Sequence, residues 1–563
     1  MNHTQWVDAG ILDLADTVVA QRLCDMAGES DSRVGLAVSL LVAALRNGSV
    51  CMDLASARDR NTADAAVDLP WPEPQAWLAA VRASPLAGNP PVLRFLDELL
   101  YFDRYWLEEQ QVCGDVAARL TAYPPPDAAA PDLTRLFPEG YAEQRSAAEV
   151  AVAQRLTILT GGPGTGKTTT VARLLAALAE QAHLAGGTGL RMALAAPTGK
   201  AAARLQEAVA LEVSRLSPVD QRRLAGVRST TLHRLLGSRP DTSSRFRHHR
   251  HNRLPYDVVV IDETSMVSLT MMARLLEAVR PDARLVLVGD PDQLASVDAG
   301  AVLADLVEGL GDVGVVELET PHRFGQSIGA LAHAVRTGDD DAAIDVLRRG
   351  GDAVGWVDTT DAVDALRASL LERAVRMRRA AVLGDASEAR AILDEHRLLC
   401  AHRRGPFGVA VWNRRVEGWL ADDTGQPLWT PWYAGRPVLV TANDYGLGVY
   451  NGDAGVVVAS THGLRAHIGS ADFAPSRLGQ VETMFAMTIH KSQGSQADEV
   501  TVLLPPPESR LLTRELFYTA VTRAKKRVVV VGPESAVRAA IGQRAKRASG
   551  LAKRLQSRRP TDP

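Results

Sequence analysis

Two patterns of hydrophobic positions divide the chain into regions. In the first 125 residues or so, apolar side chains recur at helical spacing, as in 34–45 and 92–100, which predicts a mainly helical N-terminal region. From about residue 132, short runs of β-branched and apolar residues alternate with helical stretches. These runs are Leu156–Thr160, Met192–Ala196, Val258–Asp262, Leu285–Asp290 and Val315–Leu318. The alternation is typical of a parallel sheet with helices on both faces.

A second α/β region begins near residue 335 and ends with the predicted strand Arg527–Gly532. Within it, 436–485 contains strand-like runs and the hairpin-turn signal Asn451-Gly452-Asp453, which together predict a small β-barrel-like insertion. The strand-like runs are Pro437–Ala442, Gly455–Ala459 and Val481–Met487. The basic, histidine-rich stretch Arg239–Tyr256 is expected to form a smaller insertion or hairpin, and an exposed loop explains its histidines more simply than a metal site does.

These patterns define the expected segments. They are a helical partner-docking domain at 1–125, a first α/β domain at 126–335 with an insertion near 239–256, a second α/β domain at 336–435 and 486–545, the β-barrel-like insertion at 436–485, and a basic tail at 546–563. The segment 123–131 is rich in proline and alanine and is the expected linker after the N-terminal domain.

Charge is distributed unevenly along the chain, although the net charge is only −3. Residues 1–150 carry 22 acidic and 11 basic side chains, whereas the other residues carry 44 acidic and 52 basic ones. An acidic N-terminal region before a basic body suggests two tasks, with partner docking weighed against an ordinary solvated surface for the acidic part. The basic tail either touches nucleic acid or a partner, or is a solvated helix end.

Lysine is scarce, with 7 Lys beside 56 Arg. Because Lys is a compact charge and Arg a wide planar fork, a Lys that remains in such a composition is a candidate for a position that Arg does not suit. Five of the seven lie in the motifs described below, namely Lys167, Lys200, Lys491, Lys525 and Lys526. A large class of metal-dependent nucleases needs an acidic residue two positions before a Lys, and no Lys of this chain has one. We therefore expect no such nuclease site in this chain.

The four cysteines are far apart and form no Cys-x-x-Cys pair, which argues against zinc ribbons and iron–sulfur clusters and fits a reducing cytoplasm. The first ten residues lack the basic and apolar runs of a secretory signal. The apolar run 34–45 is too short to span a bilayer. A cytoplasmic protein without membrane contact is therefore expected.

A phosphate-binding loop follows the first predicted strand of the α/β region. Gly161–Thr168 (GGPGTGKT) matches G-x-x-x-x-G-K-[ST] between a strand and a helix, where such loops wrap backbone N–H groups around an oligophosphate. The residues expected to line the nucleotide phosphates are Gly161, Gly162, Pro163, Gly164, Thr165, Gly166, Lys167, Thr168 and Thr169. Lys167 would reach the β- and γ-phosphates, and the Thr168 hydroxyl would bind Mg²⁺.

Carboxylates and cations at later strand ends complete a predicted hydrolytic site. Asp262 would hold Mg²⁺ through water, and Glu263 would orient and deprotonate the attacking water. Gln293, after the next strand, is placed to sense the γ-phosphate. Arg323 and Arg523 are the candidates for stabilising the transition state, with Arg523 expected across a cleft from the phosphate loop.

The order of these motifs resembles that of superfamily 1 helicases. Further segments match that family's motifs: Ala196–Arg204 resembles motif Ia, Thr230–Arg234 motif Ib, Thr488–Ser495 motif V and Tyr518–Lys525 motif VI. The resemblance implies two RecA-like domains that bind ATP between them and single-stranded DNA across their tops. It also implies DNA-side roles, with helix caps and core turns as the alternative, for Pro197, Thr198, Lys200, Thr231, His233, Thr488 and His490. Gln144 lies where the family's adenine-reading glutamine would be.

Several segments are similar in sequence to those of the RecD family, the alpha subunits of bacterial RecBCD enzymes (exodeoxyribonuclease V). They are Gly161–Thr170, Thr231–Gly237, Gly289–Ala301, Asn443–Gly455 and Thr488–Gly494, with a weaker match at Arg104–Trp106. This resemblance implies an ATP- and Mg²⁺-dependent helicase that moves 5′ to 3′ and unwinds and resects double-stranded DNA ends for recombinational repair. It further implies RecB-like and RecC-like partners for the acidic N-terminal domain, and an SH3-like insertion at 436–485 that presses on the DNA strand.

Two other hypotheses stay open. The first is a self-sufficient superfamily 1 helicase, which is disfavoured because the chain lacks the long N-terminal extension of stand-alone relatives. The second is a structural subunit with a vestigial nucleotide site. A nucleotide site that no longer hydrolyses ATP has no physical reason to retain a suitable residue at every catalytic position. This site retains Lys167, Thr168, Asp262, Glu263, Gln293 and Arg523.

Overall fold

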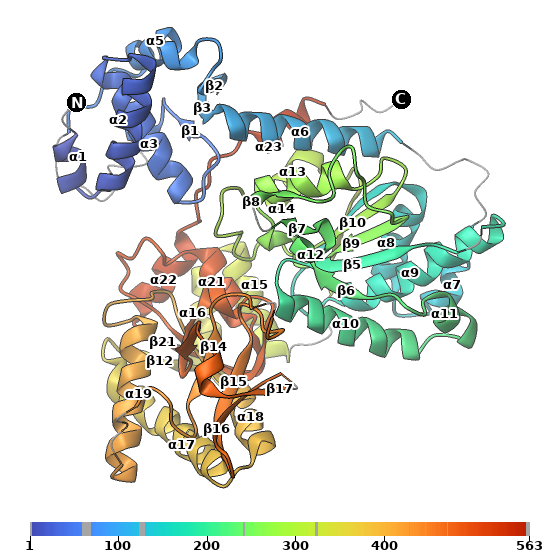
Figure 1. Ribbon diagram of the computed structural model, residues 1–563, viewed down its shortest axis with the longest axis vertical. Helices are drawn as coiled ribbons and strands as arrows, with labels where there is room; N and C mark the ends of the chain where they lie inside the picture. The colour runs from blue at the N-terminus through green and yellow to red at the C-terminus, as the bar shows by residue number, and fades with distance from the viewer. Residues whose placement is uncertain are drawn as a thin grey trace.

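Figure 1 shows the computed structural model of the chain. The structure describes residues 3–58, 69–122, 130–187, 189–239, 242–320, 325–426, 428, 430–444, 446–469 and 471–558. Within these ranges, an N-terminal head lies beside two α/β domains, each built on its own parallel sheet. No helix in the described ranges has both the length and the apolarity needed to cross a bilayer.

The head combines helices with a three-stranded antiparallel sheet. Its helices are α1 (Thr4–Asp8), α2 (Leu14–Ala27), α3 (Ser32–Arg46) and α5 (Pro74–Ala83). Its strands, in the order β1-β3-β2, are β1 (Met52–Asp53), β2 (Leu93–Leu96) and β3 (Leu99–Phe102). The buried face of α3 meets Trp77 in the core, and the Trp77 indole N–H donates to the carbonyl oxygen of Arg33 over 2.7 Å.

The helical pattern expected over 92–100 is wrong. The segment forms a hairpin in which Leu93 pairs with Phe102, and Asp97 adopts a φ of 54° in the turn. Leu93 and Leu100 are both buried. Periodicity in a short apolar run does not separate a helix from two strands, and cross-strand pairing here buries the side chains that the helical spacing had grouped.

The first parallel sheet has six strands in the order β11-β4-β10-β9-β5-β6. They are β4 (Leu156–Gly161), β5 (Met192–Ala196), β6 (Ser229–Thr231), β9 (Val258–Ile261), β10 (Arg284–Val288) and β11 (Val315–Leu318). The five predicted strands of this region are confirmed to within one or two residues at their ends. Successive residues point to opposite faces, so Val258 and Val260 enter one apolar core and Val259 and Ile261 the other.

Helices cover both faces of this sheet. One core is enclosed by α8 (Ala142–Ala153), α9 (Lys167–Leu184) and α10 (Gly199–Ser214), and the other by α13 (Leu269–Ala278) and α14 (Val302–Leu310). Between β6 and β9 the chain forms α12 (Leu232–Leu236) and the hairpin of β7 (Ser238–Arg239) and β8 (Thr242–Phe246). A hairpin is one of the two forms expected for 239–256.

A long helix of the N-terminal region, α6 (Asp103–Leu120), joins the head to the first α/β domain (Figure 1). Val112 and Val116 enter the same apolar core as β4 and α13. The Arg119 guanidinium donates to the carbonyl oxygens of Val279 (2.8 Å) and Ala283 (3.2 Å). Residues on both sides of the boundary expected at 125 therefore share one core.

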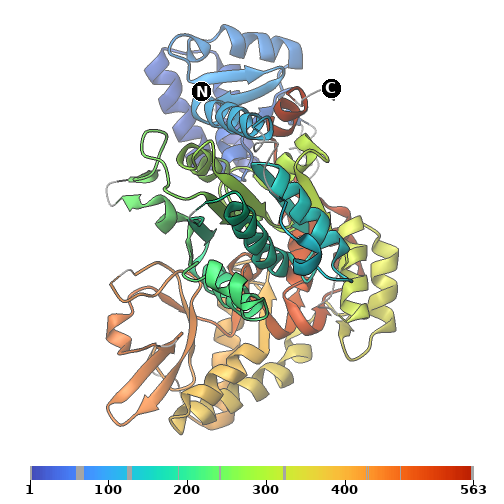
Figure 2. The same cartoon turned by 90° about the vertical axis from the view of Figure 1, so that its right-hand side faces the viewer.

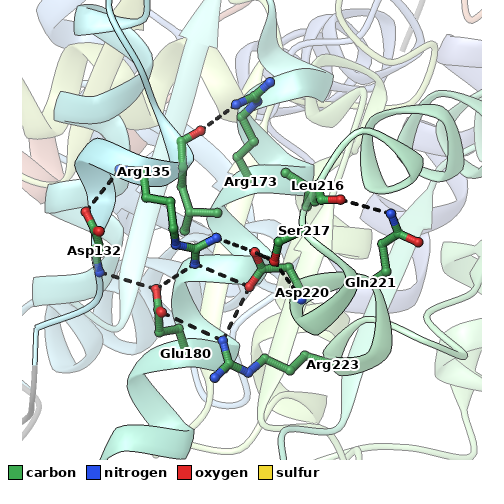
Figure 3. Close-up of polar contacts among 10 residues, drawn as sticks. Asp132, Arg135, Arg173, Glu180, Leu216, Ser217, Asp220, Gln221 and Arg223 are labelled. Atoms are coloured by element: carbon green, nitrogen blue, oxygen red, sulfur yellow. Dashed lines mark hydrogen bonds and ion pairs between the residues drawn. The ribbon is translucent and has the colours of Figure 1, made fainter.

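A polar cluster fastens the short helix α7 (Leu133–Leu136) to α9 and α11 (Pro218–Arg223) (Figure 3). The buried Asp220 carboxylate accepts bonds from Arg135, from Arg223 (3.3 Å) and from the Ser217 hydroxyl (2.7 Å), and Arg135 also bonds Glu180 at 3.0 Å. Burial raises the pKa of Asp220, but the bonds from Arg135 and Ser217 outweigh it and leave that pKa below its usual value. The cluster thus stabilises a buried charge by pairing it.

The second parallel sheet has five strands in the order β12-β21-β20-β13-β19. They are β12 (Val354–Val357), β13 (His396–Cys400), β19 (Ala486–Thr488), β20 (Ala497–Leu503) and β21 (Ala524–Val531). The helices around it are α15 (Gln326–Thr337), α16 (Asp340–Arg349), α17 (Ala362–Val382), α18 (Ala386–Glu395), α19 (Val409–Thr424), α20 (Ile489–Ser492), α21 (Arg514–Val521) and α22 (Glu534–Gly542).

An antiparallel sheet is inserted between α19 and β19, in the order β17-β16-β15-β14-β18. Its strands are β14 (Pro437–Val440), β15 (Ala454–Ser460), β16 (Gly463–Ile468), β17 (Ala471–Phe473) and β18 (Val481–Thr483). Figure 2 shows it projecting on the same side of the molecule as the β7–β8 hairpin. The single strand-like run expected at Val481–Met487 is wrong, because β18 pairs with β14 in this sheet whereas β19 pairs with β13 in the parallel one.

The C-terminal segment returns to the head and is not a free tail. After α22 the chain runs back so that α23 (Leu551–Gln556) packs against α14 and α6 (Figure 1). Leu551 and Leu555 are buried, and Arg554 pairs with the buried Glu109 at 3.2 Å. The expectation of a basic tail at 546–563 is therefore wrong over its described part, because apolar residues at helical spacing give that segment a buried face.

Candidate active site

A cavity of about 160 Å³ lies between the two α/β domains. Its walls bring together most of the residues predicted for nucleotide hydrolysis, namely Lys167, Thr168, Thr169, Asp262, Glu263, Gln293 and Arg523. Pro163, Gly164 and Gly166 of the phosphate loop line it as well. Arg323, the other predicted transition-state cation, lies outside the described residues.

The phosphate loop owes its shape to glycines with positive φ. Gly164 and Gly166 have φ values of 89° and 90°, which an L side chain rarely adopts. A Cβ on Gly161 would lie 2.5 Å from the Leu318 carbonyl oxygen, so only glycine fits where β4 meets β11. The Lys167 ammonium donates to the Gly162 carbonyl oxygen at 2.8 Å, which folds this side chain back on its own loop.

Gln144 lies beneath the phosphate loop and does not line the cavity wall. It is buried on α8, and its side-chain amide donates to the carbonyl oxygen of Thr165 over 3.3 Å. Its observed contact is therefore support of the loop. Gly162, Thr165 and Tyr518 line a smaller hollow of about 110 Å³ on the other side of that loop.

Three carboxylates meet in the cavity, those of Asp262, Glu263 and Asp290, and burial raises the pKa of Asp262 and Asp290. Burial, and then the neighbouring Glu263, raises the pKa of Asp262 to about 6, while Lys167 opposes that shift. Burial also raises the pKa of Asp290, which accepts bonds from Gln293 (3.0 Å) and from the Tyr518 hydroxyl (3.1 Å). Glu263 has a φ of 52°, a strained backbone conformation of the kind that clusters at functional sites.

Hydrogen bonds cross the cleft in both directions. From the second domain, Arg523 donates to the side-chain oxygen of Gln293 at 2.8 Å, and both side chains are buried. From the first domain, Arg204 on α10 donates to the side-chain oxygen of Gln496 at 2.7 Å and to the Gly494 carbonyl oxygen at 3.3 Å. The two domains therefore exchange arginine–glutamine bonds across one cavity.

Sequence reasoning missed the contact between Arg204 and Gln496, and also the part played by Asp290 and Tyr518. Arg204 ends the segment that resembles motif Ia, and Gln496 follows motif V, so both were within reach of the motif argument. No local pattern indicates that side chains 292 positions apart meet across a cleft.

The predicted DNA-side threonines all cap helices. The hydroxyl oxygens of Thr198, Thr231 and Thr488 accept the backbone N–H three residues later, at 3.2, 3.2 and 3.3 Å, at the starts of α10, α12 and α20. Thr231 and Thr488 share the same backbone angles (φ −74°, ψ 149°) at the ends of β6 and β19, the edge strands of the two parallel sheets. The cap alternative holds for all three residues, and a DNA contact in addition stays a prediction.

The other predicted DNA-side residues have distinct surroundings. Burial, and then the nearby Arg397, lowers the pKa of Lys200 to about 8. The exposed His233 ring packs edge-on to Phe246 of the hairpin, and burial with Arg547 lowers the pKa of the half-buried His490. Pro197 is half-buried at the end of β5.

A phosphate loop, an acidic strand end and arginines from two facing P-loop-type α/β domains define an ATPase of the superfamily 1 helicase class. Family models agree with this class. The model "RecBCD enzyme subunit RecD, N-terminal domain" matches 8–101, an AAA domain matches 139–359, and a UvrD-like helicase C-terminal domain matches 483–531.

Full-length relatives identify the family. The chain is 68% identical to the RecBCD enzyme subunit RecD of Mycolicibacterium smegmatis, covering 97% of this chain and 98% of that protein. It is 64% identical to RecD of Mycobacterium tuberculosis H37Rv, covering 98% and 96%. It is also 31% identical to the ATP-dependent RecD2 DNA helicase of Deinococcus radiodurans, covering 80% of this chain and 58% of that protein. The chain belongs to the RecD family, as its motifs predicted.

Proposed function

We propose that this chain is the ATP-dependent DNA helicase subunit of a RecBCD-type enzyme that unwinds and resects double-stranded DNA ends. The observation that carries the proposal is the cavity in which Lys167, Asp262 and Glu263 of one domain face Arg523 of the other. A nucleotide bound there touches both domains, so its hydrolysis changes their spacing. Family membership supports the assignment of DNA as the substrate and of RecB-like and RecC-like subunits as partners.

The chemistry assigned to each side chain follows from its position. Lys167 leaves its loop carbonyl to bind the β- and γ-phosphates, and Glu263 orients and deprotonates the attacking water. Arg523 stabilises charge on the transferred phosphoryl group, and its bond to Gln293 reports that the cleft is closed. The Thr168 hydroxyl and the Asp262 carboxylate line the same cavity and are ligands that suit Mg²⁺, which neutralises phosphate charge when bound. Gln144 keeps the assignment to the adenine edge that the family resemblance implies, in addition to its bond to the loop.

DNA is assigned to the side of the sheets where the capped helices begin. Strand ends with threonine, histidine and lysine groups, all exposed or half-buried except the buried Thr488, suit sequence-independent contact with phosphates. The residues assigned this role are Pro197, Thr198, Lys200, Thr231, His233, Thr488 and His490. The antiparallel sheet of 437–483 is the SH3-like element that presses on the strand, and translocation runs 5′ to 3′.

The acidic head is the partner-docking domain of this proposal. Exposed apolar side chains on α2 support it, namely Leu14, Val18, Val19 and Met26. Exposed apolar side chains grouped on one helix are typical of a protein–protein contact. The RecD2 relative keeps a stand-alone helicase as the alternative, and unwinding by the isolated chain would favour it. The filled catalytic positions disfavour a vestigial site.

The test is reconstitution with RecB-like and RecC-like subunits, followed by unwinding of DNA substrates with a 5′ or a 3′ single-stranded tail. The partner motor is inactivated so that only this chain drives unwinding. We expect activity on the 5′-tailed substrate, and Lys167→Gln should abolish it while the assembly survives. Undiminished unwinding by Lys167→Gln would refute the assignment of the site.

A further inference from the structure

A second cavity, of about 800 Å³, lies where the antiparallel sheet meets the edge of the second parallel sheet. Its lining includes four permanent cations and one carboxylate. The cations are Arg403, Arg404, Arg436 and Lys491, and the carboxylate is that of Glu482 on β18. Thr488, which Proposed function assigns to DNA, lines the same cavity. This set of residues is called the basic recess.

Glu482 is shared between two of these cations. Its carboxylate lies 2.7 Å from the Lys491 ammonium and 3.5 Å from the Arg403 guanidinium. The side chains of Glu482 and Arg403 are 45% and 74% exposed, so water and ions reach this contact. The pair is therefore an accessible contact and not part of a dry core.

Arg436 is held by protein groups and has a structural role, whereas Lys491 and Arg403 pair with the accessible Glu482 and can be transferred to a phosphate. Its guanidinium donates to the Thr483 hydroxyl at 3.0 Å and lies over the Trp432 ring at 4.8 Å. Lys491, in contrast, follows Thr488 on the first turn of α20, and the Thr488 hydroxyl accepts its backbone N–H at 3.3 Å. The Lys491 ammonium and the Thr488 cap thus lie on one wall of the recess, and Glu482 faces them from the other sheet.

We propose that the Glu482 carboxylate occupies the place of a backbone phosphate of single-stranded DNA and competes with it for Lys491 and Arg403. The proposal rests on the proposed function and adds to it two DNA-binding cations and one internal competitor. A phosphate entering the recess displaces Glu482, so each binding event breaks one ion pair before it forms another. Glu482 therefore weakens the grip on DNA, which favours release during stepping.

The size of the effect follows from the exposure of the pair. Breaking an accessible ion pair and bringing a phosphate beside a carboxylate together lower affinity by about three- to tenfold. Removing the carboxylate charge should therefore tighten binding by that factor. Each cation that becomes available to phosphate should also steepen the dependence of log affinity on log salt by roughly 0.7.

The experiment measures binding of the full-length chain to a fluorescent oligo-dT, by anisotropy, over a series of salt concentrations. Glu482→Gln should bind about three- to tenfold more tightly and show the steeper salt slope. Adding Lys491→Gln to that variant should remove the gain, and Arg403→Gln alone, at a highly exposed position, should weaken binding. The matched control is Asp472→Asn, which removes a carboxylate of similar exposure (48%) from an arginine pair on the same antiparallel sheet, away from the recess lining.

The outcomes separate this inference from the proposed function. If the natural chain binds DNA but Glu482→Gln binds no better, or binds worse, the contact is only a clamp between the two sheets and the inference fails. An equal gain from Asp472→Asn would also overturn it, because the effect would then be one of overall charge. If the natural chain neither binds single-stranded DNA nor couples it to ATP hydrolysis, the proposed function fails and the inference falls with it.

Discussion

The bond between Arg204 and Gln496 gives the sharpest prediction about cleft closure. Arg204→Met keeps the aliphatic length of the side chain and removes both bonds that it donates across the cleft. Gln496→Met removes the acceptor of one of them. Because these bonds join the two domains, they exist only while the cleft is closed, and their loss should destabilise the closed state without unfolding either domain.

The structure gives the magnitude. A 2.7 Å bond from a guanidinium to a half-buried amide oxygen is worth about 1.5–3 kcal/mol, and the 3.3 Å bond to the Gly494 carbonyl oxygen adds about 0.5–1 kcal/mol. Arg204→Met should therefore weaken closure by about 2–4 kcal/mol, or about 30- to 900-fold. Gln496→Met should cost about 1.5–3 kcal/mol, because it removes only the bond to Gln496 and the bond to Gly494 survives.

The assay is steady-state ATP hydrolysis at saturating single-stranded DNA. We expect kcat to fall at least tenfold in Arg204→Met, while the melting temperature stays within a degree or two. The double variant should be no worse than Arg204→Met alone, because the two side chains act through one bond. An unchanged kcat in Arg204→Met, or strictly additive losses in the double variant, would refute the conclusion that the Arg204–Gln496 bond stabilises the closed cleft.

Three further predictions test the fold around the site. Leu555→Ala should lower the free energy of unfolding by about 2–4 kcal/mol in chemical denaturation, because it removes a buried side chain between α23 and α14. The control variant Lys553→Ala should lower it by under about 1 kcal/mol, because the ion pair of Lys553 with Asp97 is exposed. Burial raises the pKa of Asp305 to about 7, so the folded chain holds a proton that the unfolded chain releases near pH 4, and stability falls as pH rises between these values. The melting temperature of Asp305→Asn, relative to that of the natural chain, should therefore rise from pH 5 to 7 and stay constant above pH 7. A difference in melting temperature that does not depend on pH would contradict this reasoning. Arg135→Met should destabilise the first α/β domain by about 1–3 kcal/mol in thermal unfolding, since the buried Asp220 carboxylate loses one of its partners, and an unchanged melting temperature would show that Arg223 and Ser217 suffice.

Local patterns predicted what depends on local sequence. The phosphate loop and the five strands from Leu156 to Leu318 are as expected, because four of the strands are mainly apolar runs buried on both faces, and the glycine spacing of the loop fits few backbones. The hairpin at 92–100 was mistaken for a helix because its turn at Asp97 carries no glycine or proline to mark it. Its two short strands then resemble one apolar stripe.

Long-range pairing set the limits of that prediction. Met484 and Phe485 carry no visible break, yet the chain changes sheets there, because β14 and β13 offer separate edges to β18 and β19. The buried face of α23 is equally hard to predict from sequence, because basic residues dominate the segment and only Leu551 and Leu555 indicate an apolar face. In both cases the partner surface, several elements away along the chain, decides the outcome.

The placement of Thr198 and Arg204 on one helix gives the motor a direct mechanical connection. Thr198 caps the first turn of α10 at the edge assigned to DNA, and Arg204 leaves the same helix to cross the ATP cleft. Six residues of α-helix span about 9 Å, and a helix capped at one end and packed along its length moves as a rigid body. Closure of the cleft on Gln496 must therefore shift the DNA-side end of α10 relative to the second sheet, where Thr488 caps α20 in the same way. We expect the separation of the two capping threonines to change each time a nucleotide closes the cleft, with no additional lever between the ATP cavity and the strand.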